Sequence, residues 1–208
     1  MNSKSNTKIR VISGQTLGYY NGKSEQFWQG TKDHDVTQNI EALLNSIQSE
    51  GPFHILDFGC GPGRDLVSFT KLGHKATGLD GCEKFVAMAK ENSKCDVLHQ
   101  NFIDLSLSEN TYDGIFANAS LFHVPASELE RVLNELSKSL KPGGILFTSN
   151  PRGDGEGWSG DRWCHYMEIE VYKSFLDKAN FEVVDHYYRP DSKPMEERPW
   201  LATVAKKL

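Results

Sequence analysis

The chain has 208 residues, of which 38% are hydrophobic and 25% charged, so it is long enough for one domain with a substantial core and too short for two. Its net charge of −5, without a run of Lys or Arg, argues against nucleic-acid or anionic-membrane partners. Because the chain has no apolar span or N-terminal signal pattern, and its four cysteines fit no zinc or disulfide pattern, we expect a cytoplasmic protein with reduced thiols and no metal.

The first 50 residues differ in pattern from the rest of the chain. Residues 1–15 read as a loose arm. Residues 33–48 carry apolar side chains at helical spacing, which predicts an amphipathic lid helix with Asp33 or Asp35 as its cap. A break follows at Gly51-Pro52. We therefore divide one domain into an N-terminal arm and lid helix, residues 1–50, and a core, residues 51–208.

Short apolar runs and helical patterns alternate after the break. Predicted strands lie at 54–58, 75–79, 95–99, 112–117 and 145–149. Predicted helices lie at 64–72, 82–91, 127–140 and 168–179. This alternation predicts an α/β fold with a parallel sheet and helices on both faces. The last two predicted strands, 181–188 and 200–205, have no helix between them, so they should pair antiparallel.

A glycine-rich turn at a strand-to-helix junction is the most informative local feature, with the sequence Asp57-Phe58-Gly59-Cys60-Gly61-Pro62-Gly63. Glycines there let the backbone approach a ligand, and the next helix presents free N–H groups. A dinucleotide fingerprint would need glycine where Arg64 stands, and no Gly-Lys-Ser/Thr of a phosphate loop follows. A tight turn that binds no ligand is the alternative.

Asp80 ends the second predicted strand beside this turn. A carboxylate at that place can accept hydrogen bonds from a ribose diol. The alternative role, a cap for the following helix, is compatible with the first.

Together these residues form an ordered series that resembles the motifs of class I S-adenosylmethionine-dependent methyltransferases over residues 53–150. The series is Asp57-x-Gly59-x-Gly61-x-Gly63, Asp80, Asn101-Phe102, Tyr112-Asp113-Gly114-Ile115 and Leu140-Lys141-Pro142-Gly143-Gly144. The resemblance implies a Rossmann-like, seven-stranded, mostly parallel sheet with an antiparallel last strand. It also implies S-adenosylmethionine as cofactor, S-adenosylhomocysteine as product, and no metal.

The resemblance further implies roles for individual residues. The glycine turn would hold the methionyl part of the cofactor, Asp80 the ribose, and Asn101 with Phe102 the adenine. The family usually has Asp in the place of Asn101, although an amide oxygen can still accept from the adenine amino group. The implied cofactor-binding set is Asp57, Gly59, Cys60, Gly61, Gly63, Asp80, Gly81, Asn101, Phe102 and Asn118.

Methyl transfer from a sulfonium is an in-line displacement that depends on alignment, so we expect no catalytic residue beyond those that position the reactants. The substrate must then be recognised outside the cofactor motifs. Candidates come from the aromatic stretch 19–39, the segment 118–125 and the loop 150–163. The proposed substrate set is Tyr20, Phe27, His34, Asn39, His123 and Arg152. Each candidate has an alternative role. The aromatic stretch could be a packed surface helix, His123 a hydrogen-bonded structural residue and Arg152 a solvated charge.

The phrase formed by Tyr20 and residues 27–39 resembles the opening of the methyltransferase domain of ovothiol biosynthesis. This implies N-methylation of the imidazole π-nitrogen of 5-thiohistidine or a related amino acid, with the sulfoxide synthase as a separate protein of the same pathway. Methylation of another small metabolite is the alternative. RNA and protein substrates are less favoured because no basic groove is evident, and a non-catalytic cofactor-binding protein is the third class.

Overall fold

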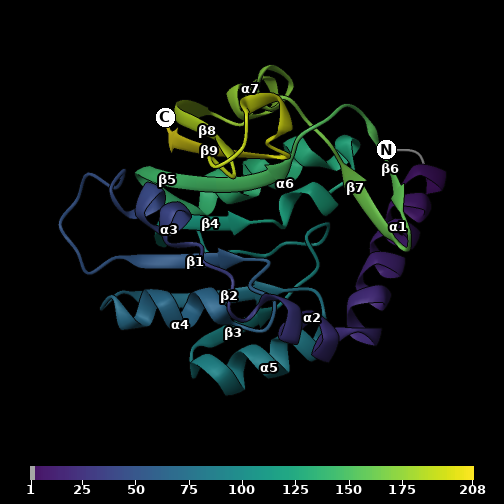
Figure 1. Cartoon of the computed structure of the whole chain (residues 1–208), viewed down its shortest axis with the longest axis horizontal. Helices are drawn as coiled ribbons and strands as arrows, with labels where there is room; N and C mark the ends of the chain where they lie inside the picture. The colour runs from purple at the N-terminus through teal and green to yellow at the C-terminus, as the bar shows by residue number, and fades with distance from the viewer. Residues whose placement is uncertain (1–2) are drawn as a thin grey trace.

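The computed structural model describes residues 3–208, so the first two residues of the expected arm lie outside the described part. Its main sheet is built from β1 (His54–Phe58), β2 (Lys75–Asp80), β3 (Asp96–His99), β4 (Tyr112–Asn118), β5 (Leu140–Pro151), β8 (Phe181–Arg189) and β9 (Trp200–Lys207). The strand order is β3-β2-β1-β4-β5-β9-β8 (Figure 1). The strands from β3 to β5 are parallel, and β9 runs antiparallel to both β5 and β8. The predicted fold class is confirmed.

Helices cover both faces of this sheet, because its central strands bury side chains in both directions. The covering helices are α3 (Thr37–Leu44), α4 (Arg64–Lys71), α5 (Glu83–Ser93), α6 (Ala126–Ser139) and α7 (Ile169–Lys178). Ile55 packs with side chains of α3, α4 and α5 on one face. The next residue, Leu56, packs with side chains of α6 and α7 on the other. The two cores therefore follow from the alternation of side chains along each strand.

The N-terminal segment is helical, so the loose arm predicted for residues 1–15 is wrong over its described part. It forms α1 (Ser3–Gly22), followed by α2 (Ser24–Thr31). In Figure 1 α1 stands beside the ends of the strands, and its C-terminal end contacts the start of α5. The predicted lid helix is the shorter α3, which packs on a sheet face, with Asp35 accepting a hydrogen bond from the Thr37 N–H at 2.9 Å.

A small hairpin, β6 (Glu156–Ser159) with β7 (Arg162–His165), lies between β5 and α7 in the chain and was not predicted. It contacts α1, where the Trp163 N–H donates to Thr16 Oγ1 at 3.0 Å. Two short 3₁₀ turns, Leu121–His123 and Met195–Glu197, complete the described elements. Within residues 3–208, no helix is both long and apolar enough to cross a membrane.

Candidate active site

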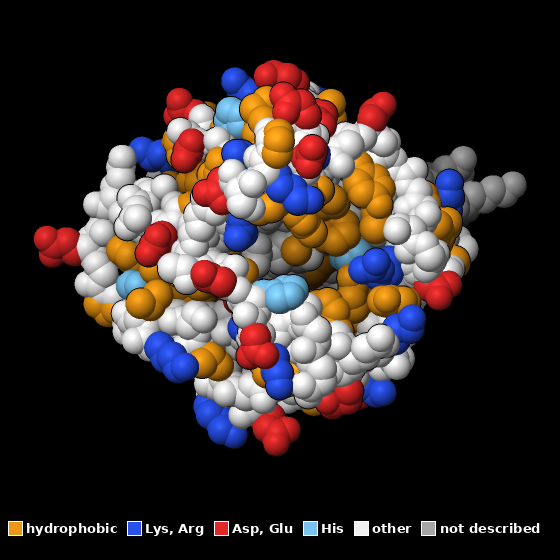
Figure 2. Space-filling model, viewed as in Figure 1, with side chains coloured by type: hydrophobic (Ala, Val, Ile, Leu, Met, Phe, Trp, Pro, Cys, Tyr) orange, Lys and Arg blue, Asp and Glu red, His pale blue; other side chains and the backbone are white. Residues whose placement is uncertain are grey.

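Two adjoining cavities lie at the carboxyl ends of β1, β2 and β4, where ligands bind in open α/β sheets. The inner cavity lies between α1 and the glycine turn, and Asp80, Asn101 and Phe102 line it. The outer cavity, of about 650 Å³, is bounded by α2, the start of α4 and the β8–β9 connection. Figure 2 shows the molecule hollowed at this end of the sheet, with apolar side chains in the hollow and basic side chains and histidine at its rim.

The glycine turn needs glycine because of its backbone and its neighbours. Gly59 and Gly61 have positive φ angles of 79° and 51°. A Cβ on Gly59 would lie 2.3 Å from the Cβ of Ser120. Ser120 in turn donates a hydrogen bond from Oγ to the carbonyl of Phe58 at 2.6 Å. The turn is thus held tightly against the segment after β4, and its backbone lines both cavities.

Asp80 is locked in place by the backbone around it. Its Oδ2 accepts from the Gly61 N–H at 3.0 Å, and its Oδ1 accepts from the Cys82 N–H at 2.8 Å at the start of α5. Burial raises the pKa of Asp80 to about 6, against the opposing effect of these N–H groups. The helix-capping role and the position in the inner cavity are therefore both present.

Two other residues of the implied cofactor set, Asp57 and Gly63, support the turn from behind, whereas Cys60 lines the outer cavity. Asp57 and Gly63 lie outside the lining of both cavities. Burial, with repulsion from Asp65, raises the pKa of Asp57 well above its usual value. A Cβ on Gly63 would lie 2.9 Å from the backbone of Ala89, so this glycine lets α4 approach α5. The Cys60 side chain points toward β2. A Cβ added to Gly78 of that strand would lie 2.9 Å from the Cys60 sulfur.

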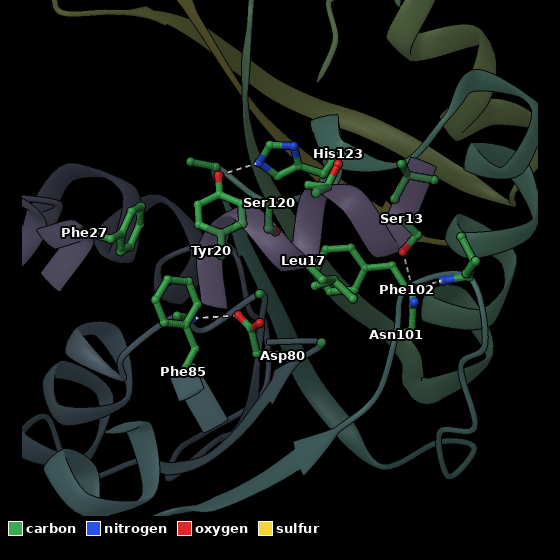
Figure 3. A pocket seen from close by; sticks show the side chains of 17 residues that line it. Ser13, Leu17, Tyr20, Phe27, Asp80, Phe85, Asn101, Phe102, Ser120 and His123 are labelled. Atoms are coloured by element: carbon green, nitrogen blue, oxygen red, sulfur yellow. Dashed lines mark hydrogen bonds between the residues drawn. The ribbon is translucent and has the colours of Figure 1, made fainter. Parts of the chain in front are cut away.

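The far end of the inner cavity combines an amide with an aromatic ring. Asn101 Oδ1 accepts from Ser13 Oγ at 2.9 Å and from the Ile103 N–H at 3.1 Å, so its Nδ2 remains as a donor (Figure 3). Phe102 stacks on Phe58 with ring centroids 4.2 Å apart. This end therefore offers a flat apolar surface and one amide donor.

Apart from Tyr20, sequence reasoning missed the residues of one wall of the inner cavity, which α1 supplies. Ser13, Thr16, Leu17 and Tyr20 line it, and Phe85 of α5 lies opposite (Figure 3). These four positions of α1 have the i, i+3, i+4, i+7 spacing of one helical face. The spacing could have indicated a helix with one face toward the cavity. The signal is weak because this face mixes small, polar and apolar side chains instead of forming an apolar stripe.

Tyr20 and Phe27 lie where the cavities meet, and they line both. With Phe85 they form an aromatic cluster whose ring centroids are 5.1 to 5.6 Å apart. His123 Nδ1 lies 2.6 Å from the carbonyl oxygen of Trp163, so this nitrogen carries the proton. The Tyr20 hydroxyl then donates to His123 Nε2 at 2.8 Å. Burial lowers the pKa of His123 to about 4, which keeps the ring neutral.

The remaining residues of the predicted substrate set fall in different places. His34 lines the outer cavity, as does Asn118 of the implied cofactor set. Asn39 is fully buried one layer behind, where its Nδ2 donates to Asn118 Oδ1 at 2.9 Å and its Oδ1 accepts from the Tyr187 hydroxyl at 2.9 Å. Asn39 therefore orients Asn118 rather than facing the cavity.

Arg152 is not brought to either cavity, contrary to its place in the predicted set. Its guanidinium donates to Glu168 at 3.1 Å and to the Met195 carbonyl at 2.9 Å, and it lies 4.2 Å from the ring centroid of Tyr188. These contacts tie the β8–β9 connection to the end of β5. Charged residues that sequence reasoning did not place in the substrate set line the outer cavity instead: Asp35, Arg64, Asp65, Arg162 and Arg189.

Known proteins resemble this chain in sequence and in fold. Residues 56–148 match the family model described as "Methyltransferase domain". The chain is 29% identical to 24-methylenesterol C-methyltransferase 3 of Arabidopsis thaliana, covering 85% of this chain and 55% of that protein. It is 35% identical to sterol 24-C-methyltransferase ERG6 of Saccharomyces cerevisiae, covering 70% and 43%. The chain thus spans about half the length of the curated relatives it matches.

Among solved structures, the fold resembles that of the 1,6-didemethyltoxoflavin-N1-methyltransferase of Burkholderia thailandensis, which was crystallised with 1,6-didemethyltoxoflavin and S-adenosylhomocysteine. The TM-score is 0.76 at 20% sequence identity, with 96% of this chain and 90% of that chain covered. The likeness therefore extends beyond the central motifs to nearly the whole chain.

Proposed function

We propose that this chain is a class I S-adenosylmethionine-dependent methyltransferase that transfers the methyl group of S-adenosylmethionine to a ring nitrogen of a small polar molecule. The observation that carries the proposal is the meeting of the two cavities. Tyr20, Phe27, Gly59 and Gly61 line both, so a ligand in the inner cavity adjoins a ligand in the outer one.

The residues of the inner cavity fit S-adenosylmethionine. The carboxylate of Asp80 suits a ribose diol, the Gly59–Gly61 backbone suits the methionyl part, and Asn101 with the Phe102 ring suits adenine. When bound, this group supplies an electrophilic methyl on a positively charged sulfur. The described residues contain no His, Cys, Asp and Glu grouping that could hold a metal ion.

The chain's own residues would align the reactants and exclude water. The aromatic cluster of Tyr20, Phe27 and Phe85 lies at the junction and suits a positive charge through its ring faces. An acceptor nitrogen in the outer cavity would use its lone pair to take the methyl group, the bonding electrons of the C–S bond would stay on sulfur, and the acceptor would release a proton to solvent. Tyr20, held by His123, presents an oriented hydroxyl beside that position.

The outer cavity supports a polar acceptor. Three arginines and two aspartates are among its lining residues, whereas a sterol presents an uncharged and nearly wholly apolar body. We therefore do not carry the substrates named for the sterol methyltransferases over to this chain. The toxoflavin-related enzyme, by its name, methylates a ring nitrogen, which is the chemistry proposed here.

Within this class we propose 5-thiohistidine, methylated at the imidazole π-nitrogen, as the acceptor. The support is the resemblance of Tyr20 and residues 27–39 to the ovothiol enzyme, together with the placement of Tyr20, Phe27 and His34 on the outer cavity. An imidazole nitrogen with a free lone pair is a competent nucleophile. A separate sulfoxide synthase would then supply the precursor in the same pathway.

A mass-spectrometric assay tests this function. Purified protein and methyl-deuterated S-adenosylmethionine are offered 5-thiohistidine, histidine and a metabolite extract in parallel. We expect one labelled methyl on 5-thiohistidine and little on histidine. A labelled product from the extract alone would reject 5-thiohistidine and keep the methyl transfer. No labelled product in any arm would contradict the proposed activity itself.

A further inference from the structure

Arg189, at the end of β8, has a guanidinium that is not engaged by the protein. Every other arginine in the described part of the chain donates at least one hydrogen bond to a named acceptor. Arg189 makes no such bond and no ion pair, although it is half-buried and lines the outer cavity. A partly desolvated guanidinium without an acceptor is unfavourable, so this position suits a ligand that brings one.

The other charges of the outer cavity are already engaged. Arg64 forms a double hydrogen bond with the adjacent Asp65, at 2.6 and 2.8 Å, so that these charges largely cancel. Arg162 lies 5.1 Å from the ring centroid of Tyr19, and its Nη1 lies 3.5 Å from the Tyr20 hydroxyl oxygen. Asp35, the remaining acid of this lining, is held by the Thr37 N–H.

Asp35 does not neutralise Arg189. The positive charge of Arg189 contributes to lowering the pKa of Asp35, mainly lowered by the hydrogen bonds from Thr37, so the two groups influence each other. They form no ion pair within 4.0 Å, and Asp35 is exposed to water. The lining has three arginines against two aspartates, although the whole chain carries −5. The cavity is therefore selective for an anionic group.

We propose that the methyl acceptor carries a carboxylate that binds to Arg189, with its methylated nitrogen toward Tyr20. The proposal rests on the proposed function and names the acceptor class for the same site. A planar guanidinium binds a carboxylate through two parallel N–H···O bonds, which fixes direction as well as distance. Guanidinium also binds phosphate, but Asp35 and Asp65 in the same lining disfavour a doubly charged anion.

Substitution at Arg189 gives the first test, with the acceptor found in the labelling assay. Arg189→Gln should raise the KM for the acceptor by about 10- to 100-fold, because charge-assisted bonds are lost. The affinity for S-adenosylhomocysteine, measured by calorimetry, should not change. Arg189→Lys keeps the positive charge but lacks the two parallel N–H donors of a guanidinium. Its KM for the acceptor should therefore lie between those of the parent protein and Arg189→Gln. Lys173→Gln, which removes one positive charge from an exposed position on α7, is the matched control and should behave as the parent protein.

The acceptor's own carboxylate gives the second test, which does not depend on how the variants fold. We expect 5-thiohistidine to be methylated far better than its decarboxylated amine, and the labelled product of an extract to carry a carboxylate. A labelled product without a carboxylate, or an unchanged KM in Arg189→Gln, would overturn the inference while leaving the methyl transfer intact. A labelled product that carries a phosphate and no carboxylate would also overturn the inference, and it would identify phosphate as the group that binds Arg189. No labelled product at all removes the proposed function, and the inference fails with it.

Discussion

At the scale of single residues, the geometry of the site depends on which groups already have partners. Tyr20 and His123 lie 103 positions apart in the chain and share one hydrogen bond of 2.8 Å. The Trp163 carbonyl determines which group donates in this bond. It accepts the Nδ1–H of the neutral His123 ring, so Nε2 can only accept from Tyr20. Asn39 acts in the same way on Asn118. Such hydrogen bonds fix the orientation of a side chain that lines a cavity.

Removing the Tyr20 hydroxyl should slow the transfer more than it weakens cofactor binding. We expect Tyr20→Phe to lower kcat by about fivefold, because one oriented hydrogen bond contributes roughly 1 kcal/mol. If His123 acts through Tyr20, His123→Ala added to Tyr20→Phe should cause no further loss. Steady-state kinetics of the two single variants and the double variant measure this coupling. Tyr19→Phe is the control, and additive losses would show that His123 acts independently.

Protonation of Asp80 should control cofactor binding. Its pKa of about 6 means that the carboxylate, which accepts hydrogen bonds, is lost as the pH falls through 6. The affinity for S-adenosylhomocysteine should therefore drop by about tenfold per pH unit below 6. Calorimetric titrations from pH 5 to 8 measure the slope, and Asp80→Asn should bind more weakly and lose this pH dependence. If the affinity of Asp80→Asn still falls below pH 6, the pH dependence belongs to another group.

The same raised pKa has the opposite effect on the stability of the unliganded chain. The folded state binds the Asp80 proton more tightly than the unfolded state, whose carboxyl has a pKa near 4. This contribution is fully present below pH 4 and is lost as the pH rises through about 6. Ligand affinity and unliganded stability thus respond to Asp80 in opposite directions over the same interval.

At the scale of elements, α1 is the least self-sufficient part of the fold. It contains Gly14, Gly18 and Gly22, and Val11 on its surface is 60% exposed. Its position depends on contacts with distant loops, which include the Arg10–Asp104 ion pair and the Ser13–Asn101 hydrogen bond. An exposed ion pair contributes at most about 1 kcal/mol, so packing at the inner cavity must provide much of what orders this helix.

Stiffening α1 should therefore tighten ligand binding. A Cβ at Gly14 or Gly18 meets no atom within 4 Å, so alanine there fits and raises helix propensity by roughly 1 kcal/mol at each site. We expect the double variant Gly14→Ala, Gly18→Ala to slow amide exchange in α1 and to bind S-adenosylhomocysteine about tenfold more tightly. Hydrogen-exchange mass spectrometry and calorimetry measure the two effects.

Gly63→Ala provides the contrast for that experiment. Gly63 has φ of 92°, and its added Cβ would lie 2.9 Å from the Ala89 backbone, so this variant should lower thermal stability. Two results would contradict this account of where glycine is required. One is an unchanged rate of amide exchange in α1 of the Gly14→Ala, Gly18→Ala variant, and the other is an unchanged thermal stability of Gly63→Ala.

At the scale of the whole molecule, the site is assembled from the N-terminal helices, the carboxyl ends of β1 to β4 with the segments that follow them, and the β8–β9 connection. The strand order places β1 beside both β2 and β4, so loops that leave in different directions meet at one end of the sheet (Figure 1). Ligand binding in the inner cavity therefore joins the N-terminal helices to the segments that follow the parallel strands of the core, over residues 13–124.

Ligand binding should accordingly stabilise the whole chain. At a concentration one hundred times its Kd, S-adenosylhomocysteine should add about 2.7 kcal/mol to the free energy of unfolding. For a chain of this size that corresponds to a rise in Tm of roughly 5 to 10 °C, which calorimetric melting measures. Asp80→Asn at the same ligand concentration should show a smaller rise. An unchanged Tm in the parent protein would indicate that the inner cavity does not bind this ligand.

The sequence by itself determined the order of strands and helices in the core, the mixed sheet, the glycine turn and Asp80. These features are local, because a strand, a turn with positive φ and a helix start are encoded within a few neighbouring residues. The helical state of α1 was missed since its polar, glycine-containing sequence becomes a helix through contacts made elsewhere in the fold.

Only the tertiary structure decided which polar residues face the outer cavity. Arg152 and Arg189 are equivalent as sequence letters, but Arg152 is bonded to Glu168 and to loop carbonyls, while Arg189 is left without an acceptor. Asn39 reads like a substrate contact until Asn118 is found between it and the cavity. A side chain's role here depends on partners that are distant in sequence, and the packing of the sheet and its helices brings those partners together.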